Sequence, residues 1–281
     1  MQIAPSTYYD VKSRPLSKRA LSDAALGVLL LALWLKNYSV YGRRKLFRAA
    51  TRAGLDIGRD QVARLMKLQG IRGASRAKKR FTTHADAGHL RAPDLINRNF
   101  TATRPDQLWV ADFTYCSTWS GIVYVAFIID VFSRRLVGWK ASRSMTADLV
   151  VAALDMAAWT RRHTSLENLV CHTDAGSQYT SILYTDRIDE IGAAPSIGTV
   201  GDSYDNAMAE SVMGIFKTEL HRNPAVLRDN GGHWKGLDDL EIATCAWVPW
   251  FNEERLHGEL GYLTPSEVEE DYRVKSQTRV A

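Results

Sequence analysis

Three carboxylates occupy positions in the sequence where a metal site is a reasonable expectation. Asp112 lies inside the apolar, β-rich run 107–117, and an ionised side chain within such a strand is costly unless it is paired or binds a metal. Asp174 ends the short apolar run 167–174, and strand ends are where sites form in α/β sheets. Glu210 lies near the start of an amphipathic helix. Ligands that are all oxygen suit Mg²⁺ or Mn²⁺ rather than Zn²⁺.

Glu210 taken alone is ambiguous. The segment "GDSYDNAMAESVMGIFKTEL" (201–220) has apolar residues at helical period, and they form one stripe: Met208, Val212, Ile215, Phe216 and Leu220. Glu210 lies off this stripe, on the same side as Asn206 and Lys217. Because most Glu side chains on helices are solvated, the pattern by itself leaves a solvated residue and a metal ligand both open.

The elements that must position these acids follow Pro105, where the periodicity changes to that of strands. Runs of β-branched and aromatic residues predict five strands: 107–117, 121–133, 134–142, 167–174 and 193–199. Helical periodicity predicts helices at 146–162, 181–192, 201–220 and 237–257. Three hairpin-linked strands followed by alternating helices and strands indicate an α/β fold, a ribonuclease-H-like mixed sheet flanked by helices.

The first part of the chain has a different character. Residues 1–100 carry 20 Lys and Arg, 6 Asp and no Glu, a net charge of +14. The remaining 181 residues carry 16 Lys and Arg against 25 Asp and Glu, a net charge of −9, which together give +5. Such an uneven distribution favours a polyanionic partner for the basic part, and nucleic acid above all.

Residues 20–36 predict one helix, and 38–73 predict two more around the turn "GLDIG". This small all-α region is a helix-turn-helix candidate that precedes the sheet. The expected inner faces of its last two helices are Leu46, Ala50 and Ala53, and then Val62, Leu65, Met66 and Gln69. The basic side chains expected at DNA here and in the following segment are Arg43, Arg44, Lys45, Arg59, Arg64, Arg72, Arg76, Lys78, Lys79 and Arg80. A solvated basic surface is the alternative.

Composition excludes several protein classes. Hydrophobic residues make up 46% and charged residues 24% of the chain, which is normal for a soluble globular protein. The longest apolar run, 24–35, is shorter than the roughly 20 residues of a membrane helix, and the first residues lack the apolar core of a secretory signal. The three scattered Cys fit a reducing cytosol and argue against a Cys-based zinc site. We therefore expect a cytoplasmic protein.

Several motifs in chain order resemble one family. "WVADFTY", "HTDAGSQYTS" and "SIGTVGDSYDNAMAESVMGIFKTEL" look like the integrase-like core of bacterial insertion-sequence transposases. The nearest type is the second-reading-frame product of the insertion-sequence-three family. The basic N-terminal helices and the tail "WFNEERLHGELGYLTPSEVEE" are similar to the corresponding segments of that family, so the resemblance covers nearly the whole chain.

The resemblance implies that Asp112, Asp174 and Glu210 are the catalytic and metal-binding Asp-Asp-Glu triad, with 35 residues between the last two. It implies Mg²⁺ or Mn²⁺ as cofactor, with two ions per active site. From their places on the same helix, Asn206 is expected to orient Glu210 and Lys217 to meet DNA. The resemblance also implies DNA cleavage at element ends, 3′-OH strand transfer and a homo-oligomer on DNA. The first-reading-frame product would join as a fusion or partner. One departure is Ala175, where many relatives carry Arg or Lys.

Four segments follow from these patterns: a helical DNA-binding region at 1–80, a basic linker at 81–105, the catalytic core at 106–225 and a helical tail at 226–281. Two other functions use the same features. A metal-dependent nuclease that only hydrolyses DNA would need the same triad, and a strand-transfer assay separates it from a transposase. A DNA-binding regulator without chemistry would explain the basic region but has no evident need for three converging carboxylates.

Other polar residues have structural interpretations. Asp130 ends a predicted strand and is expected to organise the following turn, and Asp202 and Asp205 are expected to cap the helix that carries Glu210. His257 and Trp250 are expected to pack in the tail. His172, two residues before Asp174, is either a substrate contact or a hydrogen-bonded histidine at a strand end.

Overall fold

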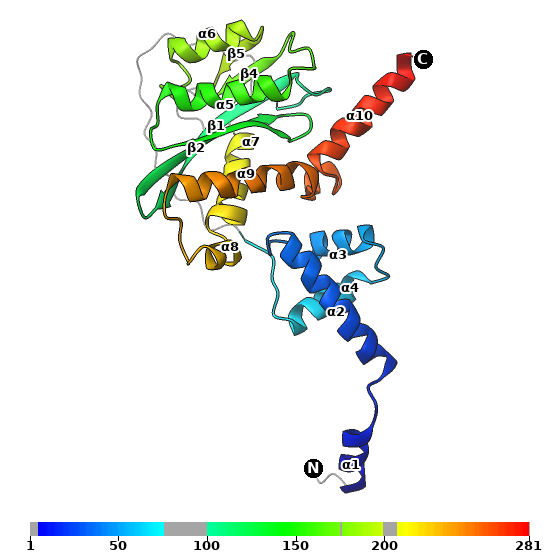
Figure 1. Ribbon diagram of the computed structural model, residues 1–281. Coiled ribbons are helices and arrows are strands. Elements are labelled where there is room, and N and C mark those ends of the chain that lie inside the picture. Colours follow the sequence, from blue (N-terminus) through cyan, green and yellow to red (C-terminus); the bar gives the residue numbers. More distant parts are fainter. Residues whose placement is uncertain (1–4, 76–99, 175, 199–206, 281) are drawn as a thin grey trace. The chain divides into compact units, whose positions relative to one another are not determined.

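The chain was analysed as a computed structural model, which describes residues 5–75, 100–174, 176–198 and 207–280 (Figure 1). It divides into two compact units, Met1–Gly73 and Ala74–Ala281. Each unit is described by itself. In the described part of the chain, no helix is both long enough and apolar enough to cross a membrane.

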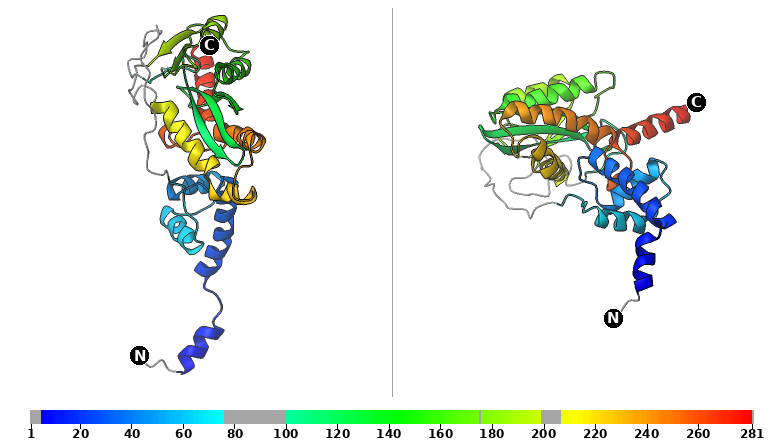
Figure 2. Two further views of the ribbon diagram at one scale, coloured as in Figure 1. Left: turned by 90° about the vertical axis from the view of Figure 1, so that its left-hand side faces the viewer. Right: turned by 60° about the horizontal axis from the view of Figure 1, so that its bottom comes forward.

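The first unit is helical, as the sequence predicts. Its helices are α1 (Pro5–Ser13), α2 (Lys18–Lys36), α3 (Arg43–Arg52) and α4 (Arg59–Leu68), and Figure 2 shows the last three grouped together. The side chains buried by α3 and α4 are Leu46, Ala50, Val62, Leu65 and Met66.

Two residues expected on the inner faces of these helices are exposed instead. Ala53 and Gln69 occupy the C-terminal cap positions of α3 and α4. The prediction was wrong because the helical spacing of residues in the sequence continues beyond the residue at which each helix ends. The glycines that follow the caps, Gly54 and Gly70, have φ of +75° and +66°, a conformation that ends a helix and that glycine adopts without strain.

The second unit contains a five-stranded sheet in the order β3-β2-β1-β4-β5. Its strands are β1 (Leu108–Thr118), β2 (Gly121–Asp130), β3 (Leu136–Ser142), β4 (Val170–Thr173) and β5 (Ala194–Ile197). The first three pair antiparallel as two hairpins, and β4 and β5 join parallel to β1. This is the mixed sheet that the sequence predicts.

Helices cover both faces of this sheet (Figure 1). On one face, α5 (Ala147–Thr160) and α6 (Ile182–Glu190) pack on Trp109, Ala111 and Ile128. On the other, α7 (Ala207–Phe216) and α9 (Leu237–Glu253) meet the ring of Phe127, with Phe216 at 5.0 Å and Trp247 at 6.2 Å between ring centroids.

The chain ends in two elements that lie outside the predicted helix 237–257. A short 3₁₀ turn, Gly258–Leu260, is followed by the long helix α10 (Pro265–Val280), whose last turns extend away from the body of this unit in Figure 1. His257 and Trp250 are buried, which confirms their expected packing role. The short helices α1 and α8 (Pro224–Asp229) were also not predicted.

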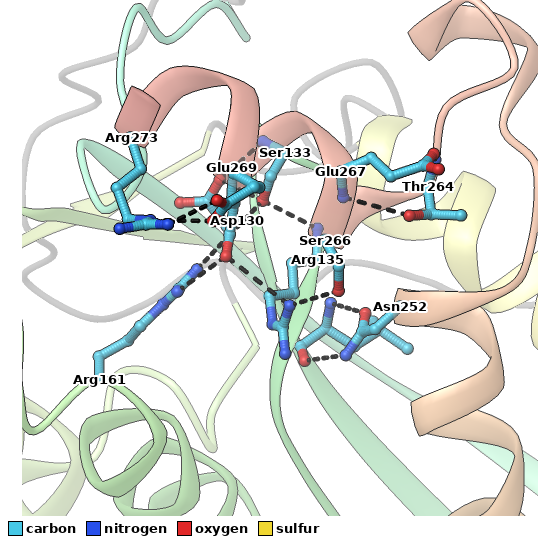
Figure 3. A network of polar contacts seen from close by, with 12 residues as sticks. Asp130, Ser133, Arg135, Arg161, Asn252, Thr264, Ser266, Glu267, Glu269 and Arg273 are labelled. Atoms are coloured by element: carbon cyan, nitrogen blue, oxygen red, sulfur yellow. Dashed lines mark hydrogen bonds and ion pairs between the residues drawn. The ribbon is translucent and has the colours of Figure 1, made fainter. Parts of the chain in front are cut away.

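A polar network anchors α10 to the sheet (Figure 3). Glu269 of α10 pairs with Arg161 at the end of α5 and accepts a hydrogen bond from the Ser133 hydroxyl at 2.7 Å. Asp130 accepts hydrogen bonds from the Ser133 backbone N–H at 2.8 Å and from its hydroxyl at 2.9 Å. Asp130 therefore organises the turn after β2, as predicted, and the same turn holds the C-terminal helix.

Candidate active site

Asp112 lies near the middle of β1, on the face of the sheet that α7 and α9 cover. The register places Asp112 opposite Phe127 of β2, and paired residues in a sheet share a face. Asp112 is partly buried, and its Oδ1 accepts a hydrogen bond from the Phe113 N–H at 2.8 Å. The strand thus fixes the carboxylate with a backbone contact.

Asp174 directly follows β4, whose register sets His172 beside Val110 of β1. Its Oδ1 accepts a hydrogen bond from the Gly176 N–H at 3.1 Å. A Cβ at position 176 would lie 3.0 Å from this same oxygen, which is tight, so glycine lets the backbone approach the carboxylate. Glu210 comes from the first turn of α7 and is partly buried.

The three carboxylates act on one another electrostatically. Burial raises the pKa of Asp112 well above its ordinary value, and the charges of Asp174 and Glu210 raise it further. Burial also raises the pKa of Asp174, and Glu210 adds to that rise. All three pairs therefore interact, so the fold gathers the three acids that the sequence singles out into one region of negative charge.

The turn after α7 contributes a cation that acts on this cluster. Lys217 places its Nζ 4.2 Å from the centroid of the Tyr115 ring on β1, and its charge lowers the pKa of Asp112. Among the described residues, no group of three or more acidic, His or Cys side chains is closed tightly enough to hold a metal ion. The donor set nevertheless has the chemistry of a hard-cation site, because it consists of carboxylates alone.

Three family models match parts of this chain. Residues 102–203 and 191–265 match two family models that are both described as "Integrase core domain", and residues 21–79 match "HTH-like domain". A relative from Mycobacterium tuberculosis, named for insertion sequence element IS986/IS6110, is 43% identical over 100% of both chains. The transposase for insertion sequence element IS629 of Shigella sonnei is 45% identical over 97% of this chain and 90% of its own.

This chain belongs to the insertion-sequence-three family of transposases. The transposase is accordingly a polynucleotidyl transferase of the Asp-Asp-Glu type that serves DNA integration and recombination. The family assignment also supports a divalent metal cofactor. A simian T-cell lymphotropic virus intasome, solved in complex with a PP2A regulatory subunit, superposes with a TM-score of 0.50 at 15% identity, over 82% of this chain and 70% of that one. That likeness concerns the fold alone.

The remaining predicted site residues fall into three groups. In the first unit of the transposase, Arg43, Arg44, Arg59 and Arg72 are exposed and Lys45 is partly buried. Arg64 instead donates two hydrogen bonds of 2.7 Å to Asp23 of α2, so its guanidinium has an intramolecular partner. The third group lies outside the described residues: Arg76, Lys78, Lys79, Arg80 and Asn206, together with the predicted caps Asp202 and Asp205.

His172 resolves as a structural residue. It is 1% exposed, and its Nδ1 lies 2.9 Å from the Ser196 hydroxyl of β5. Its ring meets Phe100 edge to face at 5.8 Å. The strand-end interpretation, with the histidine satisfied by a neighbouring strand, is therefore the one that the structure supports.

Sequence reasoning missed two features beside the site of the transposase. Tyr179 is buried next to the carboxylates, and its pKa is raised well above the ordinary value by burial and then by the charges of Asp112 and Asp174. Glu219, two residues after Lys217, forms a buried ion pair with Arg255 of the tail. No local pattern in the sequence signalled the second feature, because Glu219 and Arg255 lie 36 positions apart.

Proposed function

We propose that the transposase cleaves DNA at the ends of an insertion sequence and transfers the freed 3′-OH to a second phosphodiester, with Asp112, Asp174 and Glu210 as catalytic ligands of two divalent ions, Mg²⁺ or Mn²⁺. The observation that carries this proposal is the mutual electrostatic effect of three acids from three separate elements. Carboxylates whose charges raise the pKa of a buried neighbour are unfavourable for folding, and such groups are candidates for a functional site.

The chain's part in this chemistry is to hold the ligands in place. Bound divalent ions would activate the attacking oxygen and stabilise the leaving oxygen of an in-line displacement. The Phe113 N–H holds Asp112 and the Gly176 N–H holds Asp174, while the packing of Phe216 on Phe127 holds the helix that presents Glu210. Because burial raises the pKa of Asp112, protons compete with a cation for this carboxylate, so cation affinity should fall as the pH is lowered.

The helical first unit is proposed to hold the DNA, with the segments 1–80 and 81–105 acting as DNA-binding region and linker before the core at 106–225 and the tail at 226–281. The exposed basic side chains Arg43, Arg44, Arg59 and Arg72 are proposed phosphate contacts, together with Lys45 and, beside the carboxylates, Lys217. Replacing Arg43 and Arg44 by Gln should reduce the slope of log affinity against log salt by about 0.9 for each lost phosphate contact. Arg228→Gln, at an exposed residue of α8, is the control, and an unchanged slope in the double variant would remove these two residues from the interface.

Assembly on DNA is part of the same proposal. We infer that the transposase forms a homo-oligomer on DNA, in which one active site acts at each of the two element ends, with the first-reading-frame product as fusion or partner. Light scattering of the transposase bound to end DNA, with and without that product, measures how many copies assemble and whether the product joins them. A monomer bound to each end under conditions of full strand transfer would contradict the homo-oligomer.

The central test uses near-isosteric substitutions. Asp112→Asn, Asp174→Asn and Glu210→Gln each remove a charge with little change in volume, and each should lower cleavage and strand transfer more than about 100-fold, the usual effect of losing one electrostatic stabiliser. Asp186→Asn, at an exposed residue of α6, is the matched control. Cleavage products without joined products would indicate a hydrolytic nuclease, and metal-independent binding without either product would indicate a regulator. Full turnover in a triad variant would remove that residue from the site.

A further inference from the structure

The helix that carries Glu210 does not end as an ordinary α-helix. At Phe216, α7 gives way to the π-helical turn η1, Lys217–His221. The Arg222 N–H bonds to the Lys217 carbonyl, five residues earlier, at 2.8 Å. Such turns are rare, and they appear frequently at functional sites. Compared with a continued α-helix, a π-turn changes the direction in which the following side chains point, so it must be stabilised by contacts of its own.

The strongest of these contacts is a buried ion pair. Glu219, in the middle of the turn, is 8% exposed, and Arg255, which follows α9, is 5% exposed. The Nε of Arg255 donates to Oε2 of Glu219 at 2.6 Å and its Nη2 donates to Oε1 at 2.6 Å. A bidentate pair of this kind fixes the relative orientation of both groups as well as their distance. It therefore ties the turn to the end of α9 in one arrangement.

Both ends of the turn contact β1, the strand of Asp112. Lys217, its first residue, lies over the ring of Tyr115, and Tyr115 is three residues after Asp112. His221, its last residue, places Nε2 3.1 Å from the Ser117 carbonyl. The ion pair at the centre of the turn therefore lies between two contacts with the strand that carries Asp112.

We propose that Glu219 and Arg255 are positioning residues: by fixing the π-helical turn they place the Lys217 ammonium beside β1, where it binds a phosphate of the DNA strand at the reacting bond. This inference rests on the proposed function of the same site. Neither member of the pair touches the reacting atoms. The ligand of Lys217 is the phosphodiester backbone, so the contact is independent of DNA sequence.

A buried ion pair is not the most stabilising way to fill this space. Replacing such a pair by apolar residues of similar size is often neutral or stabilising, whereas removing one partner leaves an uncompensated buried charge. The pair is better explained by the orientation that it imposes. This distinction gives the proposal its test, because stability and positioning respond differently to removal of both charges.

The first experiment is a double-mutant cycle on the full chain with pre-cleaved end DNA, measuring kcat/KM for strand transfer. Lys217→Ala and Glu219→Gln should each lower it by about 10-fold, and the double variant should be no worse than Lys217→Ala within about 2-fold. Glu241→Gln breaks another ion pair of α9, with Lys140 at 2.6 Å, and serves as the control that should show no coupling to Lys217. Multiplicative effects of Lys217→Ala and Glu219→Gln would overturn the proposal.

The second experiment separates positioning from stability. A variant that combines Glu219→Leu with Arg255→Met removes both charges, and we expect it to melt near the wild-type temperature but to keep the loss in strand transfer. Wild-type strand transfer in this stable variant would overturn the proposal. If the wild type binds end DNA but does not join it, the proposed function fails. The double-mutant cycle is then measured from the dissociation constants of the variants for end DNA instead of from strand transfer. Coupling of Lys217 and Glu219 in that affinity supports positioning, and its absence overturns it.

Discussion

Acidification should stabilise the unit that contains the sheet, and Asp130 should be a main cause. This carboxylate is 0% exposed at the end of β2, where its Oδ2 accepts a hydrogen bond from the Asp106 N–H at 2.7 Å. Burial raises the pKa of Asp130 from the ordinary value of 3.8 to about 6, although hydrogen bonds from Ser133 and Asp106 act against the rise. Protonation therefore favours the folded state.

The sign and size of the effect follow from linkage. A folded pKa above the unfolded one means that the folded protein binds the proton more tightly, so this stability is full below the unfolded pKa and is lost as the pH rises through about 6. The whole difference corresponds to about 3 kcal/mol, at 1.36 kcal/mol per pKa unit. About 2 kcal/mol of that change falls between pH 4.5 and 7.

Urea unfolding followed by Trp fluorescence measures this effect, because every Trp except Trp34 lies in the second unit. Asp106, whose pKa burial also raises, acts in the same direction, so the informative quantity is the difference between wild type and Asp130→Asn. That difference in unfolding free energy should fall by about 2 kcal/mol from pH 4.5 to pH 7. Asp229→Asn, at an exposed residue, should run parallel to the wild type. A constant offset between wild type and Asp130→Asn at every pH would refute the reasoning.

Two further predictions concern packing and metal. A Cβ at Gly138 of β3 would lie 2.2 Å from the Ala153 carbonyl oxygen and 2.8 Å from the Ala157 nitrogen of α5, so Gly138→Ala should destabilise the fold by about 1–3 kcal/mol. Gly258→Ala should leave the stability unchanged, because the added atom meets nothing within 4 Å. Equal unfolding midpoints for the two variants would contradict the predicted clash at Gly138. Mg²⁺ at about 100 times its dissociation constant should stabilise the wild type by about 2.7 kcal/mol. Asp112→Asn should lose most of that gain in a thermal melt, whereas an equal shift in the variant, or full cleavage in EDTA, would place the metal elsewhere.

The sequence predicts the scaffold well because its signals are local. Strands β1 and β2 were expected at 107–117 and 121–133 and lie at Leu108–Thr118 and Gly121–Asp130. Their β-branched and aromatic residues carry a period that needs no knowledge of the tertiary fold. Strand β4 shortens from 167–174 to Val170–Thr173, because pairing with β1 rather than residue type decides where a strand ends.

Contacts between distant residues explain what the sequence did not reveal. Glu219 meets Arg255 across 36 positions, and Ser133 meets Glu269 across 136. No local period carries such pairings. The π-helical turn depends on the first of them, and the docking of α10 depends on the second, so neither feature was predicted. The turn lies largely within the predicted helix 201–220, and α10 lies in the predicted helical tail, beyond the predicted helix 237–257.

The packing of α9 and the Glu219–Arg255 ion pair also concern the boundary between the proposed core and the tail. Helix α9 packs Trp247 on Phe127, which is paired with Asp112 across the sheet, and the second integrase-core match extends to residue 265. The residues after 226 therefore help α7 to cover the sheet face that carries Asp112. They also supply the Arg255 that fixes the turn behind Glu210. A truncation at the proposed boundary between core and tail would expose that face and leave Glu219 buried without its cation. Removing such a partner is strongly destabilising, so the tail is physically inseparable from the site, even though none of its residues belongs to the proposed triad.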